Sequence, residues 1–289
     1  FFAALVSSKK KLSYTYSVEK VNGEVTEYTD PYTFANVTKP EDYKAFLAGE
    51  EKNAAHIFGA HERTVNGVKG VLFNVWAPKA LSVSVVGEFN KYDGRVHLME
   101  RIEDTGVFEL FIPGLAAGCG YMYEIKRQGK GTTRKLDPVS RQISSVPITA
   151  SVVSDENMPD SYAWNDGLWM IKRKKEAGKK KPVTVYEVSL TDWLKEKSAD
   201  ELVDFVKQEG YTHVCFLPVA EYLNEEMNGY STLGYFTVTH RIGGSDAFKK
   251  LVDDCHNAGI GVIIDWNGAY FGTEVKGLYD FDGADAYGY

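Results

Sequence analysis

The chain has little cysteine, and the cysteines that it has form no recognisable pattern. Its 289 residues include three, Cys119, Cys215 and Cys255, which are far apart and show neither a CxxC pair nor the spacing of a metal site. An odd, scattered set of this kind excludes a disulfide framework. It predicts reduced core thiols in a cytoplasmic protein.

Long apolar runs are also missing. No stretch approaches the roughly 18 apolar residues that a membrane-spanning helix needs. The opening residues 1–6 (FFAALV) are too short for the apolar region of a signal peptide and follow no basic stretch. We therefore expect no membrane partner. Because residue 1 is not methionine, we also expect a chain that has been cut at its front.

Basic residues are fewer than acidic ones, 33 against 40, so the net charge is −7 at pH 7. An acidic protein is repelled by phosphate backbones, so nucleic acid is a poor partner, whereas a neutral polysaccharide carries no such penalty. No phosphate-binding loop and no cluster with metal-ligand spacing is found, so we expect no metal and no nucleotide or redox cofactor. The 44% hydrophobic content is enough for two domains with cores.

Residues 1–55 are polar and mixed, and we expect no core there, only a short helix over 41–47. The pattern changes over 56–150, where short apolar or alternating runs are separated by turn residues. These runs lie at 71–76, 82–87, 107–112 and 121–126. Several short strands about ten residues apart predict an antiparallel β-sandwich, with a small barrel as the alternative.

Residues 151–182 are predicted to be a linker. Within it, 172–181 (KRKKEAGKKK) carries seven cations and ends at Pro182. A basic run can bind nucleic acid or a nuclear import receptor. Because it lies between two ordered patterns in an acidic protein, we interpret it as a solvated connecting loop.

From residue 183 onward, apolar strands alternate with helices. The strands are expected at 183–188, 213–218 and 261–265, and the helices at 198–209 and 245–257. Ser198 followed by Glu201 fits a capping box. Strands of this type predict a parallel sheet covered by helices on both faces. Residues 183–289 hold three such strands, which suits either a small open sheet or a (β/α)8 barrel cut short.

Several motifs then occur in the order of a known family. Residues 58–61 (FGAH), 67–78 (GVKGVLFNVWAP) and 85–95 (VVGEFNKYDGR) resemble carbohydrate-binding module family 48, in the form carried by bacterial glycogen branching enzymes. Further motifs follow the same family at 185–188, 212–219, 229–236 and 255–266. Residues 30–34 (DPYTF) look like the end of the extra amino-terminal domain of some members. The resemblance covers about 30–289, the amino-terminal portion of such an enzyme.

The fold that this resemblance implies is multidomain, β followed by α/β. An immunoglobulin-like sandwich over 56–150 would precede the first three β/α units of a truncated glycoside hydrolase family 13 TIM barrel over 183–289. Members of that family cut an α-1,4 bond with retention through a covalent glycosyl-enzyme. A branching enzyme, a glycosyltransferase by reaction, passes the glycosyl group to a sugar 6-hydroxyl. The implied partner is glycogen or another α-1,4-glucan.

The family's nucleophile Asp and acid Glu follow the fourth and fifth strands, beyond Tyr289. No catalytic residue is therefore assigned, and this chain alone is expected to be inactive. The resemblance implies four substrate-binding residues instead. In the barrel they are Asp265, at the end of the third strand, and Tyr230, an aromatic platform for the same sugar. In the sandwich they are Asn90 and Tyr92, whereas Trp76 is expected in the core.

Four positions depart from the family. Tyr270, Asn228, Ser189 and Met122 stand where members carry His, Trp, His and Lys, respectively. These departures motivate an alternative, a non-catalytic glucan-binding paralogue. A second alternative is a debranching or trehalose-releasing hydrolase of the same superfamily, which the motifs at 59–61 and 93–95 make less favourable than a branching enzyme. The oligomeric state is not predicted.

Overall fold

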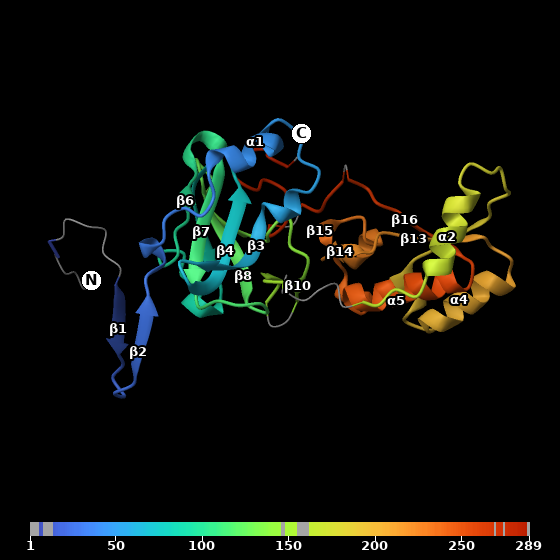
Figure 1. The fold of residues 1–289 in the computed structure, drawn as a ribbon, viewed down its shortest axis with the longest axis horizontal. Coiled ribbons are helices and arrows are strands. Elements are labelled where there is room, and N and C mark those ends of the chain that lie inside the picture. The colour runs from blue at the N-terminus through green and yellow to red at the C-terminus, as the bar shows by residue number, and fades with distance from the viewer. Residues whose placement is uncertain are drawn as a thin grey trace.

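The computed structural model describes residues 6–7, 14–145, 148–154, 162–268, 270–273 and 275–287. It begins with an antiparallel hairpin, β1 (Thr15–Glu19) and β2 (Val25–Thr29), which extends away from the sandwich (Figure 1). Three 3-10 turns and one short helix connect this hairpin to the sandwich. They are η1 (Pro31–Thr33), η2 (Pro40–Tyr43), α1 (Lys44–Leu47) and η3 (Ala54–His56).

Two antiparallel sheets form the sandwich. The first has the order β3-β4-β7-β6, with β3 (Gly59–Val65), β4 (Val68–Trp76), β7 (Val107–Pro113) and β6 (Glu100–Arg101). The second has the order β10-β11-β8-β5, with β10 (Ile143–Ser144), β11 (Ala150–Val152), β8 (Gly120–Arg127) and β5 (Ala80–Val86), and β9 (Gly131–Lys135) also pairs with β8. All four strands predicted in this region are confirmed. The short turns η4 (Glu88–Asn90) and η5 (Glu103–Thr105) lie between them.

The segment before the sandwich, within residues 1–55, also contributes to the sandwich core, although we expected no core there. Tyr43 is completely buried and packs in one cluster with Phe58, Ile102 and Val107. Its hydroxyl accepts a hydrogen bond from Asn74 Nδ2 at 2.7 Å. The expectation is therefore wrong at this point, because one aromatic ring is enough to attach a polar segment whose pattern shows no periodicity.

A parallel sheet occupies the second half of the chain. Its order is β12 (Val185–Val188), β13 (His213–Phe216) and β16 (Gly261–Ile264), as the sequence predicts. The helices between these strands are α3 (Leu190–Trp193), α4 (Ala199–Gln208) and α5 (Gly244–Asn257). The predicted capping box at the start of α4 is confirmed, since Ser198 N donates to Glu201 Oε2 at 2.7 Å and Glu201 N donates to Ser198 Oγ at 3.2 Å.

Helices cover this sheet on one face, which corrects the expectation of two covered faces. Val214 and Phe216 are completely buried in the cluster that α4 and α5 complete. On the other side of the pleat, Val185 and Ile263 remain 43% and 40% exposed. Because successive side chains of a strand point to opposite faces, the same three strands present one buried and one open apolar surface.

Helix α2 (Gly167–Glu176) replaces part of the predicted loop. Trp169 stacks on His256 of α5 with ring centroids 5.0 Å apart, and His256 Nδ1 lies 2.7 Å from Asp166 Oδ2. The first half of the basic run is thus the end of a helix, since Lys and Arg are good helix formers. Its cations are exposed, as expected. Residues 155–161 of the predicted linker lie outside the described residues.

A second hairpin, which the sequence analysis did not predict, joins β13 to α5. It consists of β14 (Ala220–Tyr222) and β15 (Thr232–Val238), with turns η6 (Glu225–Met227) and η7 (His240–Ile242) beside it. The hairpin touches the sandwich, because Leu233 packs in a cluster with Met122 and Thr237 Oγ1 donates to Ser140 O at 2.7 Å.

Residues 275–287, which we call the return segment, leave the parallel sheet and pack against the sandwich (Figure 1, red). Phe281 is completely buried in the sandwich core. Lys79 N donates to Asp282 Oδ2 at 2.8 Å, and Arg127 forms a 2.7 Å ion pair with Asp280. The sequence analysis assigned these residues to the barrel. In the structure they contact the sandwich, and their assignment to the barrel stays a prediction.

Candidate functional site

The two residues predicted in the second half of the chain lie together at the carboxyl edge of the parallel sheet. Asp265 is the first residue after β16, and Tyr230 lies in the loop of the β14–β15 hairpin. The Tyr230 hydroxyl donates a hydrogen bond to Asp265 Oδ2. In β/α barrels, substrate sites form at this edge of the sheet, because the loops that follow the strands converge there.

Gly229 fixes the direction in which Tyr230 leaves the backbone. Its φ of +87° lies in the left-handed region, which favours glycine. A Cβ atom at this position would lie 2.7 Å from the carbonyl oxygen of Pro218, which follows β13. The loop can therefore approach the sheet edge this closely only with glycine here, and that approach brings Tyr230 to Asp265.

The electrostatics of the pair keep the phenol protonated. The hydrogen bond to Asp265, partial burial and the negative charges of Asp265 and Glu187 raise the pKa of Tyr230 from 10.0 to about 12. Tyr230 is therefore a hydrogen-bond donor throughout the physiological pH range. Since its hydroxyl is engaged by Asp265, its ring is the part that remains to contact a ligand.

A pocket of about 200 Å³ adjoins the pair. Its lining combines Asp265 with apolar side chains from β15 and from both strand ends, including Phe236, Ile264 and Trp266. The Tyr235 ring lies 5.6 Å from that of Trp266. One carboxylate among aromatic rings is an arrangement that can hold a sugar by its C–H face and one hydroxyl.

In the sandwich, Asn90 lies in the turn η4 that follows β5. Asn90 is 8% exposed, and its amide is used inside its own loop. Its Oδ1 accepts from Gly87 N at 3.0 Å, and its Nδ2 donates to Val85 O at 2.8 Å. The side chain therefore holds the loop in place. A contact between Asn90 and a sugar stays a prediction.

Tyr92 follows in the same loop with a positive φ of 57°. It is half-buried, the Arg134 guanidinium carbon lies 5.7 Å from its ring centroid, and Arg134 Nη2 donates to Tyr92 O at 2.9 Å. The ring is thus held in a defined place, and a role in ligand contact stays a prediction. Trp76 packs with Phe46 and Tyr287, which agrees with its predicted place in the core.

The departures from the family occupy different environments. Met122 is 2% exposed, so its side chain belongs to the core. Ser189 caps α3, since its Oγ accepts from Asp192 N. Tyr270 is 48% exposed, and its carbonyl accepts from the Tyr235 hydroxyl at 2.7 Å. Asn228 has a left-handed backbone with φ of 49° and lies two residues before Tyr230.

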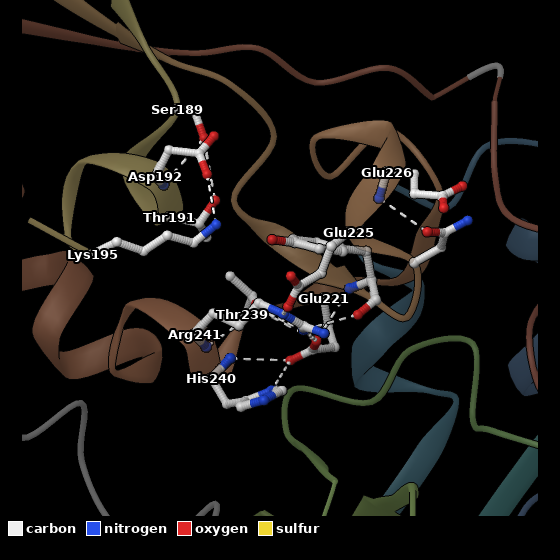
Figure 2. Close-up of polar contacts among 12 residues, drawn as sticks. Ser189, Thr191, Asp192, Lys195, Glu221, Glu225, Glu226, Thr239, His240 and Arg241 are labelled. Carbon is white, nitrogen blue, oxygen red and sulfur yellow. Dashed lines mark hydrogen bonds and ion pairs between the residues drawn. The ribbon is translucent and has the colours of Figure 1, made fainter.

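The sequence analysis missed a polar network on the other side of the hairpin (Figure 2). Its centre is Glu221, which is 3% exposed. Glu221 Oε1 accepts from Arg241 Nη1 at 2.8 Å, and Oε2 accepts from His240 N at 3.0 Å. The available signal was a carboxylate next to an apolar strand, since a buried charge requires partners of this kind.

Within the described residues, no group of three or more His, Cys, Asp or Glu side chains is arranged to hold a metal ion. Over the same residues, every helix is too short or too polar to cross a bilayer. The three cysteines are unpaired with one another.

Comparison with known proteins gives three findings. Residues 57–140 match the family Carbohydrate-binding module 48 (Isoamylase N-terminal domain). The chain is 41% identical over 275 residues to 1,4-alpha-glucan branching enzyme GlgB of Methylococcus capsulatus, an alignment that covers 92% of this chain and 37% of the relative. The protein of the same name from Nitrosococcus oceani is 40% identical, with coverages of 89% and 35%.

The chain therefore spans little more than a third of the length of the curated relatives that it matches. Among solved structures, a Salmonella typhimurium protein described as an alpha amylase matches with a TM-score of 0.55. Its sequence is 24% identical, and the match covers 76% of this chain and 34% of that one. At this identity the likeness shows the fold alone.

Proposed function

Because residues 57–140 carry a carbohydrate-binding module 48 and nine tenths of the chain aligns with GlgB proteins at about 40% identity, we propose that this chain is the amino-terminal part of a 1,4-α-glucan branching enzyme. Its contribution is to bind α-glucan. The observation that carries the proposal is the Tyr230–Asp265 hydrogen bond at the carboxyl edge of the parallel sheet. No catalytic carboxylate is assigned within the chain.

The finer architecture belongs to the same proposal. We interpret β12, β13 and β16 as the first three strands of a family 13 (β/α)8 barrel. The open apolar face with Val185 and Ile263 supports this, since a barrel buries that face in its interior. In the whole enzyme, a carboxylate nucleophile and a carboxylic acid would cut an α-1,4 bond and transfer the glycosyl group to a 6-hydroxyl. Glycogen is the substrate, in the cytoplasm.

One observation favours a second candidate, a glucan-binding protein without catalysis. Asn90, from which a glucan contact was expected, is 8% exposed, and Met122, which stands where the resembled family carries a lysine, is 2% exposed. In addition, Tyr270 replaces the histidine that the family places beside the cut bond. Such a chain would bind with fewer sugar contacts than a typical branching enzyme.

The test is affinity electrophoresis of the 289-residue chain in gels with and without glycogen. We expect glycogen to retard the chain, and we expect the double variant Tyr92→Ala/Tyr230→Ala to lose most of this retardation. Tyr279→Ala is the control for the loss of a tyrosine side chain, because Tyr279 lies in the return segment and is more exposed than either residue, at 51%. Wild-type mobility that is the same with and without glycogen would contradict both candidates.

Branching activity in the complete protein separates the two candidates. A branching enzyme raises the fraction of α-1,6 linkages in amylose, whereas a binding protein leaves it unchanged. Release of reducing ends without new α-1,6 linkages would favour a hydrolase instead.

A further inference from the structure

A second pocket, of about 210 Å³, lies on the side of the hairpin that Figure 2 shows. Asp192 and Lys195 reach it from the loop and helix that follow β12. Tyr222, Glu225 and Asn228 reach it from the hairpin, and Arg241 closes it from η7. We call it the Arg241 pocket. Neither the resemblance nor the candidate site above gives it a role.

Contacts outside the pocket hold Arg241, one of its lining residues, in a fixed position. Arg241 Nη1 donates to the buried Glu221 carboxylate at 2.8 Å and to Tyr222 O at 3.0 Å. The guanidinium carbon lies 4.4 Å from the centroid of the Tyr222 ring. A guanidinium that is paired, stacked and only 20% exposed keeps one position, so the pocket is preorganised on this side.

The charges that line the pocket cancel. Lys195 and Arg241 are cations, Asp192 and Glu225 are carboxylates, and Asn228 supplies a neutral amide. Each cation forms an ion pair with a carboxylate. Lys195 Nζ lies 2.8 Å from Asp192 Oδ1, and Arg241 Nε lies 3.3 Å from Glu225 Oε1. An anion or a cation would meet repulsion from half of these groups. A neutral polyol suits them all, because each hydroxyl both donates and accepts a hydrogen bond.

The pocket is also close to the Tyr230–Asp265 pair. Asn228 and Tyr230 are separated only by Gly229, so their Cα atoms are at most about 7 Å apart. Asn228 lines the Arg241 pocket, whereas Tyr230 binds Asp265. One glucan chain can therefore contact both sites.

We propose that the Arg241 pocket binds one glucosyl unit of an α-glucan chain whose neighbouring unit lies at Tyr230. The inference rests on the proposed function, that this chain binds α-glucan, and adds to it a sugar position that uses Lys195, Glu225 and Asn228.

Amide chemical shifts of the 289-residue chain, titrated with maltotriose, test the proposal. We expect shifts at 191–195 and 225–228 together with shifts at Tyr230. Lys195→Met and Glu225→Gln should each weaken maltotriose binding at these amides about threefold to tenfold, the size expected for the loss of one typical hydrogen bond. Both side chains are well exposed, at 64% and 68%, so the variants should fold. Glu226→Gln, one residue along in η6, is the control and should leave the affinity unchanged.

Three outcomes would overturn the inference, and they separate it from the proposed function. Shifts confined to the sandwich or to Tyr230 would remove the Arg241 pocket and leave glucan binding in place. No shift anywhere in the chain would remove both. Equal shifts at the pocket with myo-inositol would mean that any polyol enters it, which contradicts a glucosyl position.

Discussion

At the scale of single residues, the Tyr230–Asp265 pair makes a prediction about pH. The raised pKa means that the folded chain holds the phenol proton more tightly than the unfolded chain does. The stabilisation by the neutral phenol is therefore complete below pH 10, and it is lost as pH rises from 10 toward 12. In Asp265→Asn we expect the pKa of Tyr230 to fall back toward 10. The largest cause of its raised pKa is the hydrogen bond to the Asp265 carboxylate, and the substitution replaces that carboxylate with a neutral amide.

Tyrosine-selective carbon NMR between pH 8 and 12.5 measures this shift directly. Tyr16 of β1, whose pKa is raised by burial and by the Asp30 carboxylate, is the internal control, because the Asp265→Asn substitution leaves both of these causes in place. An unchanged Tyr230 titration in Asp265→Asn would show that burial, rather than the carboxylate, sets the pKa.

The residue scale also shows what sequence can and cannot predict about the site. Tyr230 and Asp265 came from motifs, and the structure brings the two side chains into contact. For Asn90, the loop sequence does not reveal that its amide already bonds Gly87 and Val85, which only the structure shows. Glu221 and Arg241 were missed because they lie 20 residues apart, and nothing local in either segment shows that they pair.

At the scale of elements, the return segment makes the sharpest prediction. Phe281 is completely buried in the sandwich core, although it lies 131 residues after β11 begins at Ala150. Phe281→Ala should destabilise the sandwich by about 3–5 kcal/mol, the usual cost of removing a buried phenyl ring.

Urea denaturation followed by circular dichroism measures the change. The control is Phe236→Ala, since Phe236 is 52% exposed and should cost about 1 kcal/mol or less. Equal midpoints for the two variants would mean that the return segment does not contribute to the sandwich.

Local pattern predicted most elements and failed in recognisable ways. Strands such as β4 and the capped helix α4 carry their periodicity and cap within a dozen residues, so sequence alone located them. Helix α2 was taken for a loop because its charge was given more weight than its helix propensity. The contact of the return segment with the sandwich was not predicted, because its one buried ring is fixed by tertiary contacts, which no local pattern encodes.

At the scale of the whole molecule, the two halves should differ in stability. The sandwich buries both inner faces of its sheets. Among the residues that the structure describes, the parallel sheet is open on one face, and its edge strands β12 and β16 each pair with β13 alone. Open faces and edges favour local opening and association between chains. We therefore expect the amides of β12 and β16 to exchange with solvent faster than those of β4 and β7.

Hydrogen exchange followed by mass spectrometry at several chain concentrations measures this difference. The amides of β13, which has a partner on both sides, provide the comparison within the same sheet. Equal, strong protection of β12, β16 and β4 would contradict the expectation. It would imply that the open face is covered.

The return segment also sets an order of events during synthesis. Ribosomes add about 5–20 residues per second, so Phe281 is made about 7–26 s after Ala150. Throughout that interval the nascent sandwich has all of its strands but lacks one ring of its core. The sandwich is therefore completed only after β12, β13 and β16 have been made, although its strands are translated before them, and a chaperone that shields apolar surface can act on the sandwich in this window.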